Sequence, residues 1–194
     1  VLFSGPLTGS PWPHYAPTVW QLHLVGHWDR KDLSGVNTTA PANLRDGLTT
    51  YALQAGGKYK LGPVLAAING WYGKNTGNLL GNIFQIQLPD KPDVQGFGVW
   101  GQVGVSLAQG FSAWGFAGID RPNRDQAFAA NLARVQNVQL AFMLAYVNGP
   151  LTATLEWMHI ATENAVASTM PGVLPQTTTT THGNQPSFTI AYAF

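Results

Sequence analysis

The stretch Ser187-Phe188-Thr189-Ile190-Ala191-Tyr192-Ala193-Phe194 decides the fold class of this chain. Its large apolar residues, Phe188, Ile190, Tyr192 and Phe194, alternate with Thr189, Ala191 and Ala193. A period of two is typical of a β-strand with one apolar face and one small or polar face. A strand of a transmembrane barrel, whose alternate residues contact lipid, and an edge strand of a soluble sandwich both fit this pattern.

The composition favours the membrane alternative. Charged residues make up 10% of the 194 residues, against about 25% in a typical soluble domain. The chain has 22 Gly and 7 Trp, but it has no apolar run of about 18 residues that would predict a membrane-spanning helix. Strands of a membrane barrel are only half apolar, and they satisfy both observations.

Alternation of apolar and polar residues predicts eight strands. Their approximate ranges are Thr18–Trp28, Thr49–Lys60, Val64–Gly73, Gln95–Leu107, Phe111–Ile119, Arg134–Val147, Leu151–Ala161 and Ser187–Phe194. The facing of the third and fifth strands is ambiguous, since large residues occur at both parities. We expect an all-β, antiparallel transmembrane β-barrel meander over residues 18–194.

The connections between these strands alternate in length. Tight turns are expected at Leu61-Gly62-Pro63, Ala108-Gln109-Gly110 and Asn148-Gly149-Pro150. Long connections are expected over residues 29–48, 74–94, 120–133 and 162–186. In an antiparallel meander this places every tight turn at one end and every long loop at the other, as in outer-membrane barrels.

Few charges lie inside the expected strands. Among the 10 basic and 9 acidic residues, only Lys58, Lys60, Arg134 and Glu156 do so. By parity Lys58, Lys60 and Glu156 face the lumen, whereas Arg134 shares parity with the lipid face near the loop end of its strand. We expect Glu156, with Lys58 or Lys60, to tune ion selectivity. Two interpretations of Glu156 stay open. Either it pairs with Arg134 or Lys58 and shapes a constriction, or it is a solvated lumen carboxylate.

The chain also resembles a known family. Its final strand is similar to the C-terminal strand of bacterial outer-membrane barrels, which the barrel assembly machinery reads, and this implies an assembly role for Phe188, Ile190, Tyr192 and Phe194. Residues 95–194 loosely resemble DcaP-like porins through Gly118-Ile119-Asp120-Arg121-Pro122, Arg134, Asn137, Leu155-Glu156-Trp157, the Thr-rich loop and Asn184-Gln185. The resemblance implies passive diffusion of small polar solutes or ions across the outer membrane of a Gram-negative bacterium. It also implies contact with outer-membrane lipid, and it allows a homotrimer or a larger complex.

The size of the barrel stays open. Porins of that family have about twice as many strands, so the chain is either a C-terminal half or a whole eight-stranded barrel with a filled interior. Residues 1–17, rich in Pro and Gly, indicate a loop arriving from an earlier strand, and no leader is visible before it. The alternative to a channel is a non-conducting barrel that serves as a structural protein, an adhesin or a partner subunit.

Other chemistry finds little support in the residues. His23 and His27 lie about 13 Å apart on one strand face, too far to share a metal, and Cys is absent. No nucleophile–base motif or phosphate loop occurs, so we expect no enzyme, cofactor or metal. A net charge of +1 makes no case for nucleic acid. The apolar segment Gly77–Leu88 is expected to fold into the lumen, extend the wall or contact a partner, and Thr177–Thr181 to form a loop tip.

Overall fold

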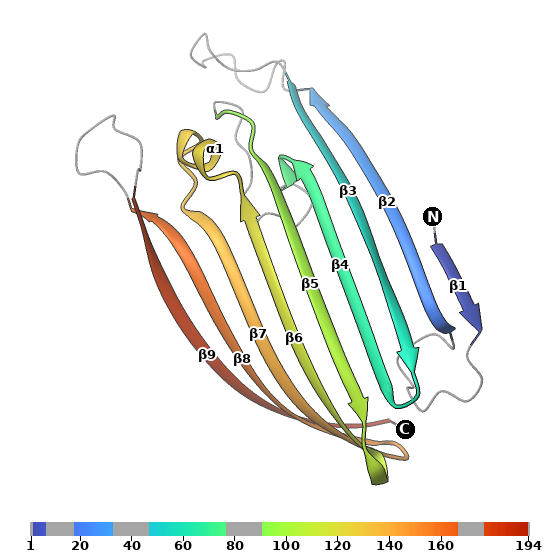
Figure 1. Ribbon diagram of the computed structural model, residues 1–194. Helices are drawn as coiled ribbons and strands as arrows, with labels where there is room; N and C mark the ends of the chain where they lie inside the picture. Colours follow the sequence, from blue (N-terminus) through green and yellow to red (C-terminus); the bar gives the residue numbers. More distant parts are fainter. Residues whose placement is uncertain (1, 7–17, 33–46, 77–90, 167–176, 194) are drawn as a thin grey trace.

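Nine strands pair in chain order to form one antiparallel sheet in the computed structural model, as Figure 1 shows. The structure describes residues 2–6, 18–32, 47–76, 91–166 and 177–193. The strands are β1 (Leu2–Pro6), β2 (Thr18–Asp32), β3 (Gly47–Leu61), β4 (Val64–Lys74), β5 (Gln95–Ser106), β6 (Phe111–Pro122), β7 (Arg134–Asn148), β8 (Leu151–Val166) and β9 (Thr177–Tyr192). The predicted all-β meander is confirmed. The sheet is open, because β1 and β9 are its two edges.

Three tight turns close hairpins at one end of the sheet, as predicted. Gly62 and Gly149 have positive φ angles of 55° and 56°, and each precedes a proline. A positive φ followed by the fixed negative φ of proline suits a type II′ hairpin turn. The third turn contains the 3-10 turn Ala108–Gly110. The strand ends that lead into the long connections lie at the opposite end.

The strands extend further toward the long-connection end than the sequence predicted. Eight charged residues that were assigned to loops lie near these strand ends: Asp29, Arg30, Lys31, Asp32, Lys74, Asp120, Arg121 and Glu163. The prediction that only four charges occupy strands is therefore wrong. The ladder needs only extended backbone, so it continues beyond the part of each strand that carries the apolar pattern.

The Thr-rich segment is the clearest case. Thr177–Thr181 was predicted to be a loop tip, but it belongs to β9 and pairs with β8 from Thr162 to Val166. Threonine is β-branched and suits a strand, and cross-strand hydroxyl contacts stabilise the pairing. The Thr178 hydroxyl donates to Glu163 at 2.5 Å, and the Asn164 amide donates to Thr181 at 3.1 Å.

Proline at position 186 led the sequence prediction to start the last strand too late. Ala193 donates to the Pro150 carbonyl at 3.0 Å, and bonding alternates along an antiparallel pair. Counted back from Ala193, the odd-numbered residues of β9 bond to β8, so the amide position of Pro186 points away from β8. An edge strand therefore accepts this proline without losing a bond in the β8–β9 ladder.

At the N-terminal end, the prediction of a loop over residues 1–17 is wrong for Leu2–Pro6. These residues form β1, which pairs with β2 from Leu2–His23 to Pro6–Thr18. Strand β2 offers an unpaired edge on this side, and pairing satisfies its backbone groups. The predicted loop residues 7–17 and the apolar segment Gly77–Leu88 lie outside the described residues.

A small core forms at the long-connection end, where only a loop was predicted. The short helix α1 (Arg124–Ala129) begins after Asn123, whose side chain accepts from the Gln126 amide at 3.1 Å. Buried Ala127 packs in a cluster with Val94, Ala130, Leu132 and Val135. Asn123 and the acidic Asp125 after it are helix-start signals that the sequence carries.

Asn75 fastens this end of the sheet. Its side-chain amide donates to the Thr49 carbonyl at 2.9 Å and to Asp93 at 2.8 Å, and its side-chain oxygen accepts from the Val94 amide at 3.0 Å. The residue is 1% exposed. One side chain thus links β3, β4 and the segment that enters β5.

None of the helices in the described part of the chain is long and apolar enough to cross a membrane.

The Asn75→Ala substitution tests this fastening. It removes three hydrogen bonds and leaves buried groups unpaired, so we expect the free energy of unfolding to fall by about 3 kcal/mol in urea. Exposed Asn131 has a similar φ, 53° against 56° for Asn75, so Asn131→Ala controls for backbone strain alone. Equal losses in the two variants would mean that the side-chain bonds of Asn75 contribute nothing.

Candidate functional site

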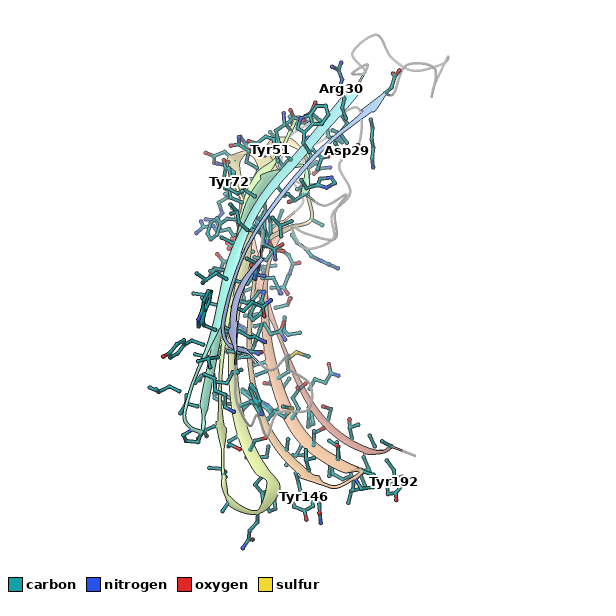
Figure 2. All side chains as sticks on the ribbon, turned by 90° about the vertical axis from the view of Figure 1, so that its right-hand side faces the viewer. Asp29, Arg30, Tyr51, Tyr72, Tyr146 and Tyr192 are labelled. Carbon is teal, nitrogen blue, oxygen red and sulfur yellow. The ribbon has the colours of Figure 1, made fainter. Side chains whose placement is uncertain are left out.

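The two faces of the sheet differ in chemistry. The sheet is strongly bent, and Tyr72 projects from its convex side in Figure 2. Through the ladder, Tyr72 shares this face with Leu53 and Phe97. Among the described residues of β2 to β9, every exposed large apolar side chain except Val25 and Val166 lies on this convex face.

We call these side chains the apolar band. Its members in the strands are Trp20, Leu22, Leu24 and Trp28 of β2, Leu53, Tyr59 and Leu61 of β3, Val64, Ile68 and Tyr72 of β4, Phe97, Val99 and Val103 of β5, Phe111 of β6, Leu140, Phe142 and Leu144 of β7, Leu155 and Trp157 of β8, and Phe188, Ile190 and Tyr192 of β9. A soluble monomer rarely exposes a contiguous apolar patch of more than a few hundred Å². The band instead extends across all the strands from β2 to β9.

The apolar band runs obliquely to the strands. Its members on β2 extend from Trp20 to Trp28, centred on Leu24, and the ladder row of Leu24 reaches His182 on β9. On β9 the band is instead centred on Ile190, eight residues beyond His182. From β2 to β9, the centre of the band therefore shifts by about 26 Å in the strand direction, while the seven strand spacings cover about 34 Å across the sheet. The normal to the band is therefore inclined by about 40° to the strands.

A polar margin borders the band at β8 and β9. The Phe142 and Trp157 rings stack at 6.0 Å, and Trp157 stacks in turn on His159 at 6.0 Å. His159 stacks on His182 at 5.5 Å, and its Nδ1 lies 3.0 Å from the Asn184 side-chain oxygen. Along these strands the surface therefore changes from apolar to aromatic and then to polar.

The concave face carries the polar residues that the sequence assigned to a lumen. Gln54, Gln102, Gln139 and Thr189 lie on it, and Leu22, Leu53, Val103, Leu140, Leu155 and Ile190 lie on the convex face, as parity predicted. A hollow of about 920 Å³ occupies the concave face over β5 to β8. Glu156 is the one ionisable side chain among its lining residues.

The charged lumen candidates fall at distant points of this face. Glu156 and Lys60 share one ladder row, which runs through Leu65, Gly104, Trp114 and Met143. Five strand spacings separate them, or about 24 Å along the sheet. Lys58 lies two ladder rows further from the tight turns, and the same five strand spacings separate its strand from that of Glu156. The structure therefore does not bring Glu156 together with Lys58 or Lys60, and it sets a carboxylate and two amines on separate parts of the concave face.

The predicted facing of Arg134 is wrong. Its ladder partner is Asn164, and the register shifts between Arg134 and Gln136. The bulge at Val135 reverses the parity, so Arg134 lies on the concave side of the ladder and not on the convex side as predicted. It is also eight residues along β8 from the position of Glu156, about 26 Å. The predicted pair between Glu156 and Arg134 is therefore not formed.

Aromatic side chains on the concave face were not recognised from the sequence as a group. Trp71, Trp100, Trp114 and Phe116 lie at the concave parity of β4, β5 and β6, and Trp100 stacks on Phe116 at 5.9 Å. Counting across the tight turns resolves the facing of both ambiguous strands, because Leu61 pairs with Val64 and Ser106 with Ser112. That count was available in the sequence.

Three of the four predicted assembly-signal residues lie within the described part of the chain. Phe188, Ile190 and Tyr192 lie on the convex face of β9 and are 66%, 62% and 59% exposed. Phe194 lies outside the described residues. Their assembly role stays a prediction.

Comparisons with known proteins identify no relative. No family model matches the chain, and neither the curated proteins nor the solved structures give a match. The likeness to DcaP-like porins therefore rests on the quoted motifs alone, and the function has to be argued from the geometry of the two faces. Within the described residues, no group of three His, Cys, Asp or Glu side chains could hold a metal ion.

Proposed function

We propose that the chain forms the wall of an outer-membrane β-barrel channel for passive diffusion of small polar solutes or ions. The inclination of the apolar band carries this proposal. Strands of outer-membrane barrels cross the bilayer at about 35–45°, and the band normal lies at about 40° to the strands. The lipid-facing band of a barrel is perpendicular to the barrel axis. When the strands are tilted from that axis by about 40°, the normal to the band makes the same angle with the strands.

The two ends of the sheet support the same orientation. The band reaches the tight turns at Leu61, Val64 and Phe111. At the other end β6 to β9 extend well past the band, and Asp120, Arg121 and Glu163 lie in these extensions. Short periplasmic turns and long external extensions are typical of this class. In this orientation the barrel contacts outer-membrane lipid through the convex face and water through the concave face.

Charge on the convex face tests the contact with lipid. Ile190→Arg puts a cation at the centre of the band on β9, where the cost at the bilayer midplane is about 2–4 kcal/mol. Thr180→Arg is the matched control, since it lies on the same face of the same strand beyond the band. We expect the unfolding free energy in phospholipid bilayers to fall only for Ile190→Arg. Equal effects would count against lipid contact.

Conductance tests the channel itself. The detergent-purified assembly should conduct small ions in a planar bilayer, and Glu156→Gln should lower the cation-to-anion permeability ratio on the order of twofold, because lumen charge sets ion preference. Lys60→Gln should move the ratio in the opposite direction.

Glu163→Gln is the matched control on the same strand. Glu163 lies at the long-connection end, where it contacts Arg124 and Thr178, and its removal should leave the reversal potential unchanged. Absence of conductance above background would favour the non-conducting barrel that serves as a structural protein, adhesin or partner subunit.

A further inference from the structure

The hollow on the concave face combines aromatic surface with a single negative charge. Its lining includes Trp114 and Phe116 of β6, Gln139 and Met143 of β7, and Glu156 of β8. Its volume of about 920 Å³ lies within the range of sites that hold small organic ligands, about 300–1,000 Å³.

Trp114 is held flat against the sheet by a glycine. A Cβ on Gly104, directly across the ladder, would lie 2.4 Å from Cε3 and 2.6 Å from both Cδ2 and Cζ3 of the indole. Three ring atoms at nearly equal distance mean that the ring presents its face to Gly104. The opposite face therefore looks into the hollow. The Trp114 Nε1–H donates to the Ser112 hydroxyl at 3.2 Å, which fixes the ring further.

Glu156 lies in the same ladder row as Trp114, with Met143 between them. The two backbones are about 10 Å apart, and the bend of the sheet turns both side chains toward the hollow. A carboxylate attracts a cation, and the face of a Trp ring attracts one as well. The remaining lining includes the apolar side chains of Phe116, Ala141, Met143 and Val147, which suit an apolar body, beside amide and hydroxyl groups.

We propose that this hollow binds organic cations, meaning an ammonium group on a compact aromatic or aliphatic body. The ammonium contacts Glu156 and the body packs on Trp114 and Phe116. The inference rests on the proposed function in one respect, since it takes the concave face as the water-filled lumen. It adds the solute class: cationic amphiphiles rather than small polar solutes in general.

Matched probes separate charge from shape. We would titrate the assembly in detergent with 2-phenylethylammonium, 2-phenylethanol and propylammonium, and follow binding by ligand-detected NMR. The first should bind on the order of tenfold more tightly than either of the others. Equal affinity for the cation and the alcohol would overturn the proposal.

Substitutions assign the site. Glu156→Gln should remove the preference for the cation over the alcohol, whereas Gly104→Ala should displace the indole and weaken the cation at least several-fold. Gly101→Ala is the matched control on β5, because a Cβ there meets only the Ala67 carbonyl at 3.6 Å. Trp114→Leu, which keeps apolar bulk without the ring face, replaces Gly104→Ala if that variant fails to assemble. Unchanged affinity in Glu156→Gln would refute the site.

The outcome is separable from the channel. Selective cation binding in an assembly that does not conduct supports this site and refutes the proposed channel. Conductance without selective binding refutes the site and leaves the channel in place.

Discussion

The antiparallel ladder is the constraint on which the rest of the structure depends. From β2 to β9 its register shifts at one point, the bulge at Val135. Because side chains alternate along a strand, a slip of one residue would exchange the two faces of a whole strand. The Gly62 and Gly149 turns and the 3-10 turn before Phe111 hold each hairpin in place. The convex apolar band and the concave hollow are both consequences of this fixed register.

The two faces of the sheet differ in the environment that their side chains favour. The apolar band exposes side chains that water would disfavour, and the proposed membrane placement removes that cost by contact with lipid. The hollow on the concave face sets ring surfaces beside amides and one carboxylate, which the proposed water-filled interior would solvate. The small core of Val94, Ala127 and Val135 and the buried Asn75 stabilise the end of the sheet that extends past the band.

Strand order, turn positions and the facing of six strands could be predicted from alternation and turn residues, which are local signals. The facing of the other two strands follows from the count of residues across the tight turns. The ends of β8 and β9 could not be predicted, because a Thr-rich segment and a proline are typical of loops. Their place in a strand follows only from their pairing with β8. The facing of Arg134 depends on a bulge that alternation does not predict. Trp114 was ambiguous for a different reason, because its neighbours are large at both parities. Its orientation over Gly104 depends on a residue of another strand.

The most direct measurement compares membrane depth at three positions. The chain has no Cys, so single spin labels can be introduced at Leu24, His182 and Ile190 and their depths read by power saturation in bilayers. If the barrel axis is inclined by about 40° to the strands, labels at Leu24 and Ile190 have the same depth, and the label at His182 lies about 20 Å nearer the surface. Equal depths for Leu24 and His182, which share a ladder row, would contradict the membrane placement.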